Sequence, residues 1–80
     1  MNIKVLIVDD HVLIREGLRR ILSLEPSIAL VGEAENGKQA IEVVTEKNVD
    51  VVLLDINMPE MNGIKACQLI KKNSPKTQVI

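Results

Sequence analysis

The chain of 80 residues contains no phenylalanine, tyrosine or tryptophan. Without aromatic side chains it cannot stack the bases of single-stranded nucleic acid, which excludes that class of binding surface.

Its single cysteine, Cys67, can form neither an internal disulfide nor a cysteine metal site. Cys67 lies at helical spacing from other apolar positions, so the pattern predicts a buried thiol; these positions are Ile64, Leu69 and Ile70.

Neither sign of charge dominates, because 10 basic residues face 11 acidic ones and the formal net charge is −1. This balance argues against a nucleic-acid or anionic-membrane surface in this chain. No apolar run approaches the length of a membrane-spanning helix, and the apolar stretch after Lys4 is too short for a signal peptide. We therefore expect one small cytoplasmic domain without membrane contact.

Two apolar runs are present, and each ends on acid. Residues 5–8 are followed by Asp9 and Asp10, and residues 51–54, which Asp50 separates from Val49, are followed by Asp55. Such runs consist of aliphatic residues without polar alternation, which is typical of strands covered on both faces in a parallel sheet. The chain is therefore expected to bury the middle of a sheet beneath helices.

Strand and helix patterns alternate along the chain. The expected strands are residues 3–8, 28–32, 49–54 and 77–80. The expected helices are one that starts near residue 13 and is closed by Glu25 and Pro26, a segment between Gly37 and Asn48, and residues 64–72. This order predicts an α/β fold, a doubly wound parallel sheet with right-handed crossovers. Asn48 is a candidate for a left-handed residue ending the second helix.

The first helix is expected to be amphipathic. Its apolar stripe consists of Leu13, Ile14, Leu18, Ile21 and Leu22. The opposite, solvated face is expected to hold Arg15, Glu16, Arg19 and Arg20. His11, which opens this helix beside the acids, is expected to make local hydrogen bonds.

Asp9, Asp10 and Asp55 follow the carboxyl ends of two strands. If these strands are neighbours, the three carboxylates converge at the edge where ligands bind in open parallel sheets. Converging carboxylates repel one another unless a cation is present, and carboxylate oxygens suit Mg²⁺. The pattern therefore predicts metal-dependent phosphate chemistry. The alternative for Asp9 and Asp10 is a helix N-cap with a solvated neighbour.

Three segments together resemble the receiver domain of two-component response regulators. They are Ile-Val-Asp-Asp at 7–10, Leu-Leu-Asp-Ile-Asn-Met-Pro at 53–59 and Asn-Gly at 62–63. The resemblance spans the whole chain in order. The Asp-Asp-His start and the Val-Gly-Glu-Ala-Glu-Asn-Gly stretch at 31–37 are most similar to the NarL/FixJ class, which joins its receiver to a DNA-binding helix-turn-helix domain.

The resemblance implies a flavodoxin-like sheet with strand order 2-1-3-4 and a role for each site residue. Asp55 would be the phosphoacceptor that takes a phosphoryl group from a sensor histidine kinase. Asp10 would bind Mg²⁺ directly and Asp9 largely through water, and the backbone carbonyl of Asn57 would complete the ligands. DNA binding would belong to an output domain outside this chain.

The resemblance also implies parts of a receiver that these residues do not contain. A Ser or Thr after strand four, a Lys after strand five and the aromatic residue of strand five would all follow Ile80. Residues 1–80 are therefore expected to be the N-terminal part of a receiver, with an incomplete sheet. Its bare fourth strand and partly covered first helix would favour self-association or partial unfolding.

Other functions remain open at this point. A truncated receiver could act only as a self-associating structural or interaction module. An aspartyl-phosphate enzyme would need an Asp-x-Asp pair with a general acid, but Asn57 stands where the second acid would be, so we expect no enzyme. A dinucleotide-binding fold would need a glycine-rich turn after the first strand, which is absent.

Overall fold

The computed structural model of the chain describes residues 2–55 and 63–80. Its elements are β1 (Ile3–Val8), α1 (Val12–Ser23), β2 (Ile28–Ala34), α2 (Gly37–Glu46), β3 (Val51–Leu54), α3 (Gly63–Asn73) and β4 (Gln78–Val79). The predicted alternation of strands and helices is confirmed.

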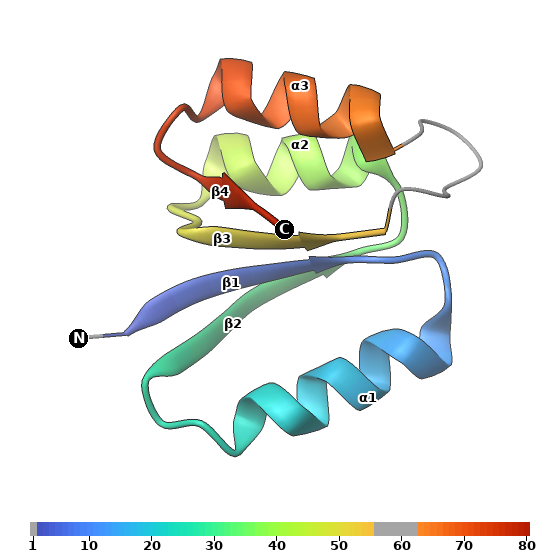
Figure 1. The fold of residues 1–80 in the computed structure, drawn as a ribbon, viewed down its shortest axis with the longest axis vertical. Coiled ribbons are helices and arrows are strands. Elements are labelled where there is room, and N and C mark those ends of the chain that lie inside the picture. Colours follow the sequence, from blue (N-terminus) through green and yellow to red (C-terminus); the bar gives the residue numbers. More distant parts are fainter. Residues whose placement is uncertain (1, 56–62) are drawn as a thin grey trace.

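The strands form one parallel sheet in the order β2-β1-β3-β4, which confirms the predicted topology. Helix α1 lies on one face of this sheet, and α2 and α3 lie on the other (Figure 1). The chain thus leaves β1 toward one face and β3 toward the other. The strand order reverses between these two strands, and ligands of doubly wound folds bind beyond the carboxyl ends at such a point.

The main hydrophobic core lies between the sheet and the α2–α3 layer. Its buried members are Leu6, Val8, Ala34, Ala40, Val44, Val49, Val52, Ala66 and Ile70. In α2 the inward positions are those predicted: Ala40 and Val44 are buried, and Ile41 packs against the core. Each fully buried aliphatic side chain contributes about 1.5–3 kcal/mol, so this layer supplies most of the hydrophobic stabilisation.

Helix α1 is covered less completely, as expected, and contributes no buried residue. Its rotation differs from the prediction. Leu13 and Ile21, assigned to the inward stripe, are 81% and 64% exposed. Leu18 is half-buried, and the side chain of Arg15, predicted to be solvated, is only 16% exposed. Arg15 faces the sheet because its guanidinium has polar partners there.

Strand β2 continues to Ala34, two residues beyond the end predicted at position 32. The register between β1 and β2 shifts between Val5 and Leu6: Val5 pairs with Leu30, whereas Leu6 pairs with Gly32. One extra residue, Val31, is therefore accommodated in β2 as a bulge. The carbonyl of Val31 accepts a hydrogen bond from Lys47 Nζ at 2.9 Å. Gly32 therefore lies within the strand and does not end it.

Helix α2 begins with a side-chain cap. Asn36 Oδ1 accepts the backbone N–H of Gln39 at 2.9 Å, and Gln39 Oε1 accepts the backbone N–H of Glu35 at 3.0 Å. This arrangement is a variant of the capping box. The last residue of the helix is Glu46, the C-cap residue Lys47 has an extended backbone, and no described non-glycine residue has a positive φ. The predicted left-handed stop at Asn48 is therefore wrong.

Helix α3 places Ala66 and Ile70 in the core, four residues apart. Cys67 follows Ala66 by one residue, so it lies beside the face of α3 that packs into the core, and it is only half-buried. The prediction of a buried thiol is therefore wrong. Ile64, at the start of the helix, is 66% exposed.

Thr77 anchors the turn that leads from α3 into β4. The side chain is fully buried, and its Oγ1 donates to the carbonyl of Val49 at 2.7 Å. Ser74 Oγ lies 2.7 Å from the same hydroxyl. These bonds hold the start of β4 beside the start of β3. Among the described residues, no helix combines the length and the apolar character needed to cross a bilayer.

Candidate functional site

Backbone pairing at the ends of β1 and β3 brings the predicted acids together. The N–H of Asp9 donates to the carbonyl of Ala34 at 3.0 Å, which ties the end of β1 to β2. The N–H of Asp55 donates to the carbonyl of Val8 at 2.9 Å, which ties the end of β3 to β1. The two acidic strand ends are therefore neighbours, as the sequence predicted.

Among residues 2–55 and 63–80, four side chains converge at this edge: Asp9, Asp10, His11 and Asp55. One potential ligand atom from each lies within 4.8 Å of all the others. Asp9 is buried, Asp10 and Asp55 are half-buried, and His11 is exposed. A compact group of carboxylate oxygens is an arrangement that can bind a divalent cation.

His11 lies across the carboxylates. Its Nδ1 is 2.8 Å from Asp9 Oδ1, 3.0 Å from Asp10 Oδ1 and 3.8 Å from Asp55 Oδ2. The hydrogen bond to Asp9 raises the pKa of His11 above its ordinary value, and the negative charge of Asp10 raises it further. The prediction of local hydrogen bonding by His11 is confirmed, and in addition its ring approaches the acid on β3.

Asp10 carries an oxygen that supports a metal site. Its Oδ1 is buried and has no hydrogen-bond partner among the described residues. The His11 ring atom 3.0 Å away is an ion-pair neighbour and not a hydrogen-bond donor to it. Buried carboxylate oxygens without a donor are costly, and a bound cation would satisfy this one. The residues of the site therefore fit Mg²⁺ by both ligand type and unmet coordination.

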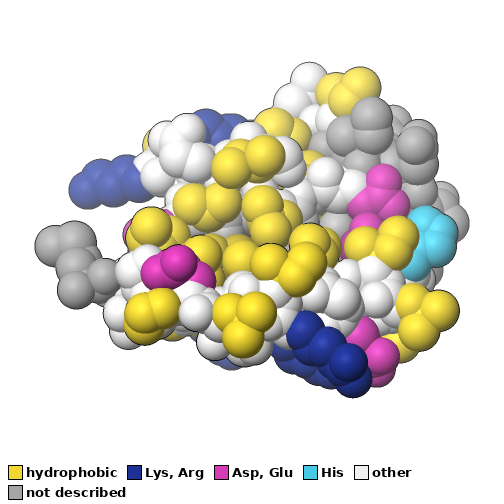
Figure 2. Space-filling model, turned by 60° about the horizontal axis from the view of Figure 1, so that its bottom comes forward, with side chains coloured by type: hydrophobic (Ala, Val, Ile, Leu, Met, Phe, Trp, Pro, Cys, Tyr) yellow, Lys and Arg dark blue, Asp and Glu magenta, His cyan; other side chains and the backbone are white. Residues whose placement is uncertain are grey.

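The side chain of Asp55 is 20% exposed, so its carboxylate can be reached from the solvent. Beside it lies an open groove of about 470 Å³ between α1 and the sheet. Val8, Asp9, His11, Ile14, Leu18, Leu53, Leu54, Asp55 and Ile80 line this groove. In Figure 2 an apolar surface fills the middle of this face and reaches toward the histidine and acidic side chains.

The N-cap alternative for the acid pair does not hold. The N-cap of α1 is His11, and its side chain makes no capping hydrogen bond. Asp9 Oδ1 instead accepts the backbone N–H of His11 at 2.8 Å, which closes a tight turn just before the helix. Asn57, the remaining predicted ligand, lies outside the described residues.

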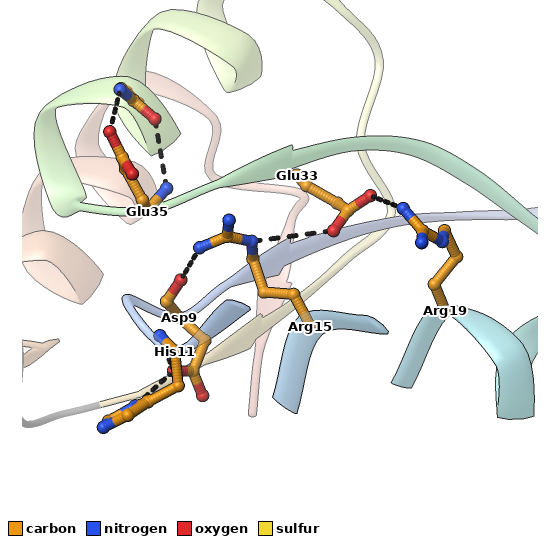
Figure 3. A network of polar contacts seen from close by, with 7 residues as sticks. Asp9, His11, Arg15, Arg19, Glu33 and Glu35 are labelled. Carbon is orange, nitrogen blue, oxygen red and sulfur yellow. Dashed lines mark hydrogen bonds and ion pairs between the residues drawn. The ribbon is translucent and has the colours of Figure 1, made fainter. Parts of the chain in front are cut away.

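Two residues beside the site, Arg15 and Arg19, were predicted from the sequence to be solvated and not to contact the site or its neighbours. Arg15 Nη1 donates to the backbone carbonyl of Asp9 at 2.6 Å, and Arg15 Nε lies 3.6 Å from Glu33 Oε1 (Figure 3). Arg19 Nη1 donates to Glu33 Oε2 at 3.2 Å. The four-residue spacing of Arg15 and Arg19 was a signal that both point the same way, but nothing in the sequence pairs them with Glu33.

Comparison with known proteins identifies the domain. The family model described as the response regulator receiver domain matches residues 5–80. The transcriptional regulatory protein DegU of Brevibacillus brevis is 44% identical over 79 residues, which are 99% of this chain and 34% of DegU. The chain thus spans about a third of that relative.

Two further proteins show the range of this similarity. A protein-glutamate methylesterase/protein-glutamine glutaminase of Carboxydothermus hydrogenoformans is 45% identical over 79 residues, 99% of this chain and 22% of the relative. The signal receiver domain of NarL from Mycobacterium tuberculosis superimposes with a TM-score of 0.90 at 40% identity, covering 98% of this chain and 63% of that one. This chain is therefore similar in sequence both to a relative named as a transcriptional regulatory protein and to one named as an enzyme.

Proposed function

Because this chain belongs to the family of response regulator receiver domains, we propose that it is a phosphoacceptor module of a two-component system. In this proposal Asp55 accepts a phosphoryl group from the phosphohistidine of a sensor histidine kinase. The observation that carries the proposal is the convergence of Asp55 with Asp9 and Asp10 at the switch point of the sheet.

The proposed reaction is a displacement at phosphorus. A carboxylate oxygen of Asp55 forms a bond to phosphorus while the bond between phosphorus and the kinase imidazole nitrogen breaks, and that nitrogen retains the electron pair. In-line attack needs a nucleophile that is held firmly yet is reachable. The backbone hydrogen bond from Asp55 to Val8 supplies the first property, and the 20% exposure of its side chain supplies the second.

Asp9, Asp10 and Asp55 are the described residues that would hold Mg²⁺. Bound Mg²⁺ supplies neutralisation of the charge on the phosphoryl oxygens. The Oδ1 of Asp10, which accepts no hydrogen bond from the described residues, and the neighbouring carboxylate oxygens support this assignment. We extend it to the backbone carbonyl of Asn57 on the basis of the family resemblance alone.

We further propose that phosphorylation controls a DNA-binding output. The relative DegU is named a transcriptional regulatory protein, and this chain corresponds to about a third of it. An output with methylesterase activity, as in the name of the Carboxydothermus relative, is the alternative. The receiver itself is proposed to be a signalling module and not an enzyme, and we assign it to the cytoplasm, where we place its kinase partner.

The experiment that tests the phosphoacceptor is incubation with acetyl phosphate and Mg²⁺, followed by intact-mass and peptide mass spectrometry. One phosphoryl group should be found on Asp55, and Asp55→Asn should abolish it. Asp50→Asn is the matched control, because Asp50 lies at the opposite end of the β3 region and its Oδ2 only accepts the N–H of Lys4. Labelling that survives Asp55→Asn would contradict the proposal.

A second candidate function is self-association through the apolar face of α1. Ile14 on this helix lines the groove and is 48% exposed, and Ile80 across the groove is 75% exposed. Exposed apolar surface of this kind commonly marks an interaction site. In this alternative the module acts by pairing with a second copy, and phosphorylation at Asp55 is not required for pairing.

A further inference from the structure

Asp9 is held from two sides. Its N–H bonds to Ala34 within the sheet, and its carbonyl lies beyond the end of the β1 ladder and needs another donor. Arg15 Nη1 provides that donor at 2.6 Å, reaching back from the first turn of α1 (Figure 3). The bond is short because the donor is a cation.

Glu33 keeps this guanidinium in place. The carboxylate of Glu33 lies 3.6 Å from Arg15 Nε, so the same side chain of Arg15 contacts β2 with one nitrogen and the end of β1 with another. A guanidinium is rigid and planar, so fixing one nitrogen orients the others. The low exposure of Arg15, 16%, limits competition from water.

The bulge in β2 places the side chain of Glu33 on the face of the sheet that α1 covers. Glu33 pairs with Ile7 of β1, whereas the neighbouring pairs Leu6–Gly32 and Val8–Ala34 belong to the α2 side. Side chains alternate along a strand, so an unshifted register would direct Glu33 toward α2. The extra residue at Val31 turns it toward α1 and its arginines.

We propose that Arg15 is a positioning residue of the acidic site. By holding the Asp9 carbonyl, it fixes the turn that carries Asp9, Asp10 and His11, and so presents the first two carboxylates in the arrangement that binds Mg²⁺. This inference rests on the proposed function. Outer-shell partners of metal ligands typically contribute 10–100-fold to metal affinity, and Arg15 acts through the backbone, so we expect an effect of about tenfold, at the lower end.

The test is a Mg²⁺ titration of the full chain, followed by the amide chemical shifts of Asp9, Asp10 and His11. Arg15→Gln should weaken binding about tenfold. Arg15→Lys should restore part of the affinity, because it retains the charge but cannot keep both contacts. Arg19→Gln is the matched control: it removes the exposed pair to Glu33 without touching Asp9, and affinity should stay unchanged.

A second measurement is made on the metal-free protein. The His11 amide donates to Asp9 Oδ1, so its hydrogen exchange reports the order of the turn. Arg15→Gln should accelerate that exchange, and Arg19→Gln should not. If Arg15→Gln does not fold, Glu33→Gln replaces it, because it leaves the Arg15–Asp9 bond present but removes the charge that holds it.

The outcomes separate this inference from the proposed function. The role of Arg15 is overturned if Arg15→Gln and Arg19→Gln have equal Mg²⁺ affinity and equal hydrogen exchange at the His11 amide. Where Glu33→Gln replaces Arg15→Gln, an unaltered Mg²⁺ affinity and exchange rate in Glu33→Gln overturn it. Either result leaves the acidic site itself intact. If the unsubstituted chain shows no Mg²⁺ shifts at these amides, the metal assignment of the proposed function fails instead.

Discussion

Oδ1 of Asp9 interacts twice with His11: it accepts the backbone N–H at 2.8 Å and lies 2.8 Å from ring Nδ1. A carboxylate oxygen can only accept, so Nδ1 carries the hydrogen in this arrangement. The turn between β1 and α1 is thereby closed on itself, and the imidazole is placed over the acids. This relationship leads to the first of four predictions.

We predict that His11 titrates above its ordinary value in the metal-free protein, because the Asp9 hydrogen bond and the Asp10 charge favour the imidazolium. The measurement is an NMR pH titration of the His11 ring in the presence of a chelator. Asp9→Asn should bring the pKa back toward the ordinary value of about 6.5. A pKa at or below that value in the unsubstituted chain would contradict the prediction.

The raised pKa of His11 also determines the direction in which pH changes the stability of the fold. The folded state binds the His11 proton more tightly than the unfolded state does. Its stabilising contribution is therefore fully present below about pH 6.5, the unfolded value, and is lost as pH rises through the folded pKa. Urea unfolding across that range, compared between the unsubstituted chain and His11→Gln, measures the contribution.

The second prediction concerns Mg²⁺ and thermal stability. A cation that binds only the folded state stabilises it by about 2.7 kcal/mol at a concentration 100 times its Kd. Mg²⁺ should therefore raise the melting temperature of the unsubstituted chain and of Asp50→Asn. It should have little effect on Asp10→Asn, because that variant loses the negative charge at Oδ1, the buried oxygen that accepts no hydrogen bond from the described residues. Equal shifts in all three proteins would place the cation elsewhere.

The third prediction is that Thr77→Val destabilises the fold. The substitution keeps the volume of the side chain but removes the hydroxyl, so the buried carbonyl of Val49 and the Ser74 hydroxyl lose a partner. The cost should be about 1–3 kcal/mol. Thr45→Val is the control, because Thr45 is exposed and its hydroxyl donates to the Ile41 carbonyl within the same helix, so the effect should stay within about 0.5 kcal/mol. Thermal melts followed by circular dichroism compare the two.

The fourth prediction tests self-association. Ile14→Asp puts a charge into the wall of the apolar groove and should weaken any dimer measured by sedimentation equilibrium. Leu24→Asp alters a residue that is more exposed, at 83%, but lies outside the groove, and it should leave the dimer unchanged. A chain that is monomeric at every concentration tested would exclude the self-associating module.

The local sequence pattern was sufficient to predict the strands and helices and their order along the chain. Unbroken aliphatic runs indicated central strands, and the residues following them, Asp9 and Asp55, lie at the same sheet edge because parallel strands end together. The rotation of α1 was not predictable in the same way. Hydrophobic periodicity assigns Arg15 to the solvent, whereas the hydrogen bond to Asp9 and the ion pair with Glu33 turn it inward, and these partners are 6 and 18 residues away.

The sequence by itself determined the α/β class, the strand order through family resemblance, and the meeting of Asp9, Asp10 and Asp55. These features depend on local periodicity and on the handedness of crossovers, which short segments specify. The tertiary structure alone decided the bulge at Val31, and through it which face Glu33 occupies. A shift of one residue in a strand reverses the direction of every side chain after it, and its position depends on packing against both neighbouring layers, which no local pattern records.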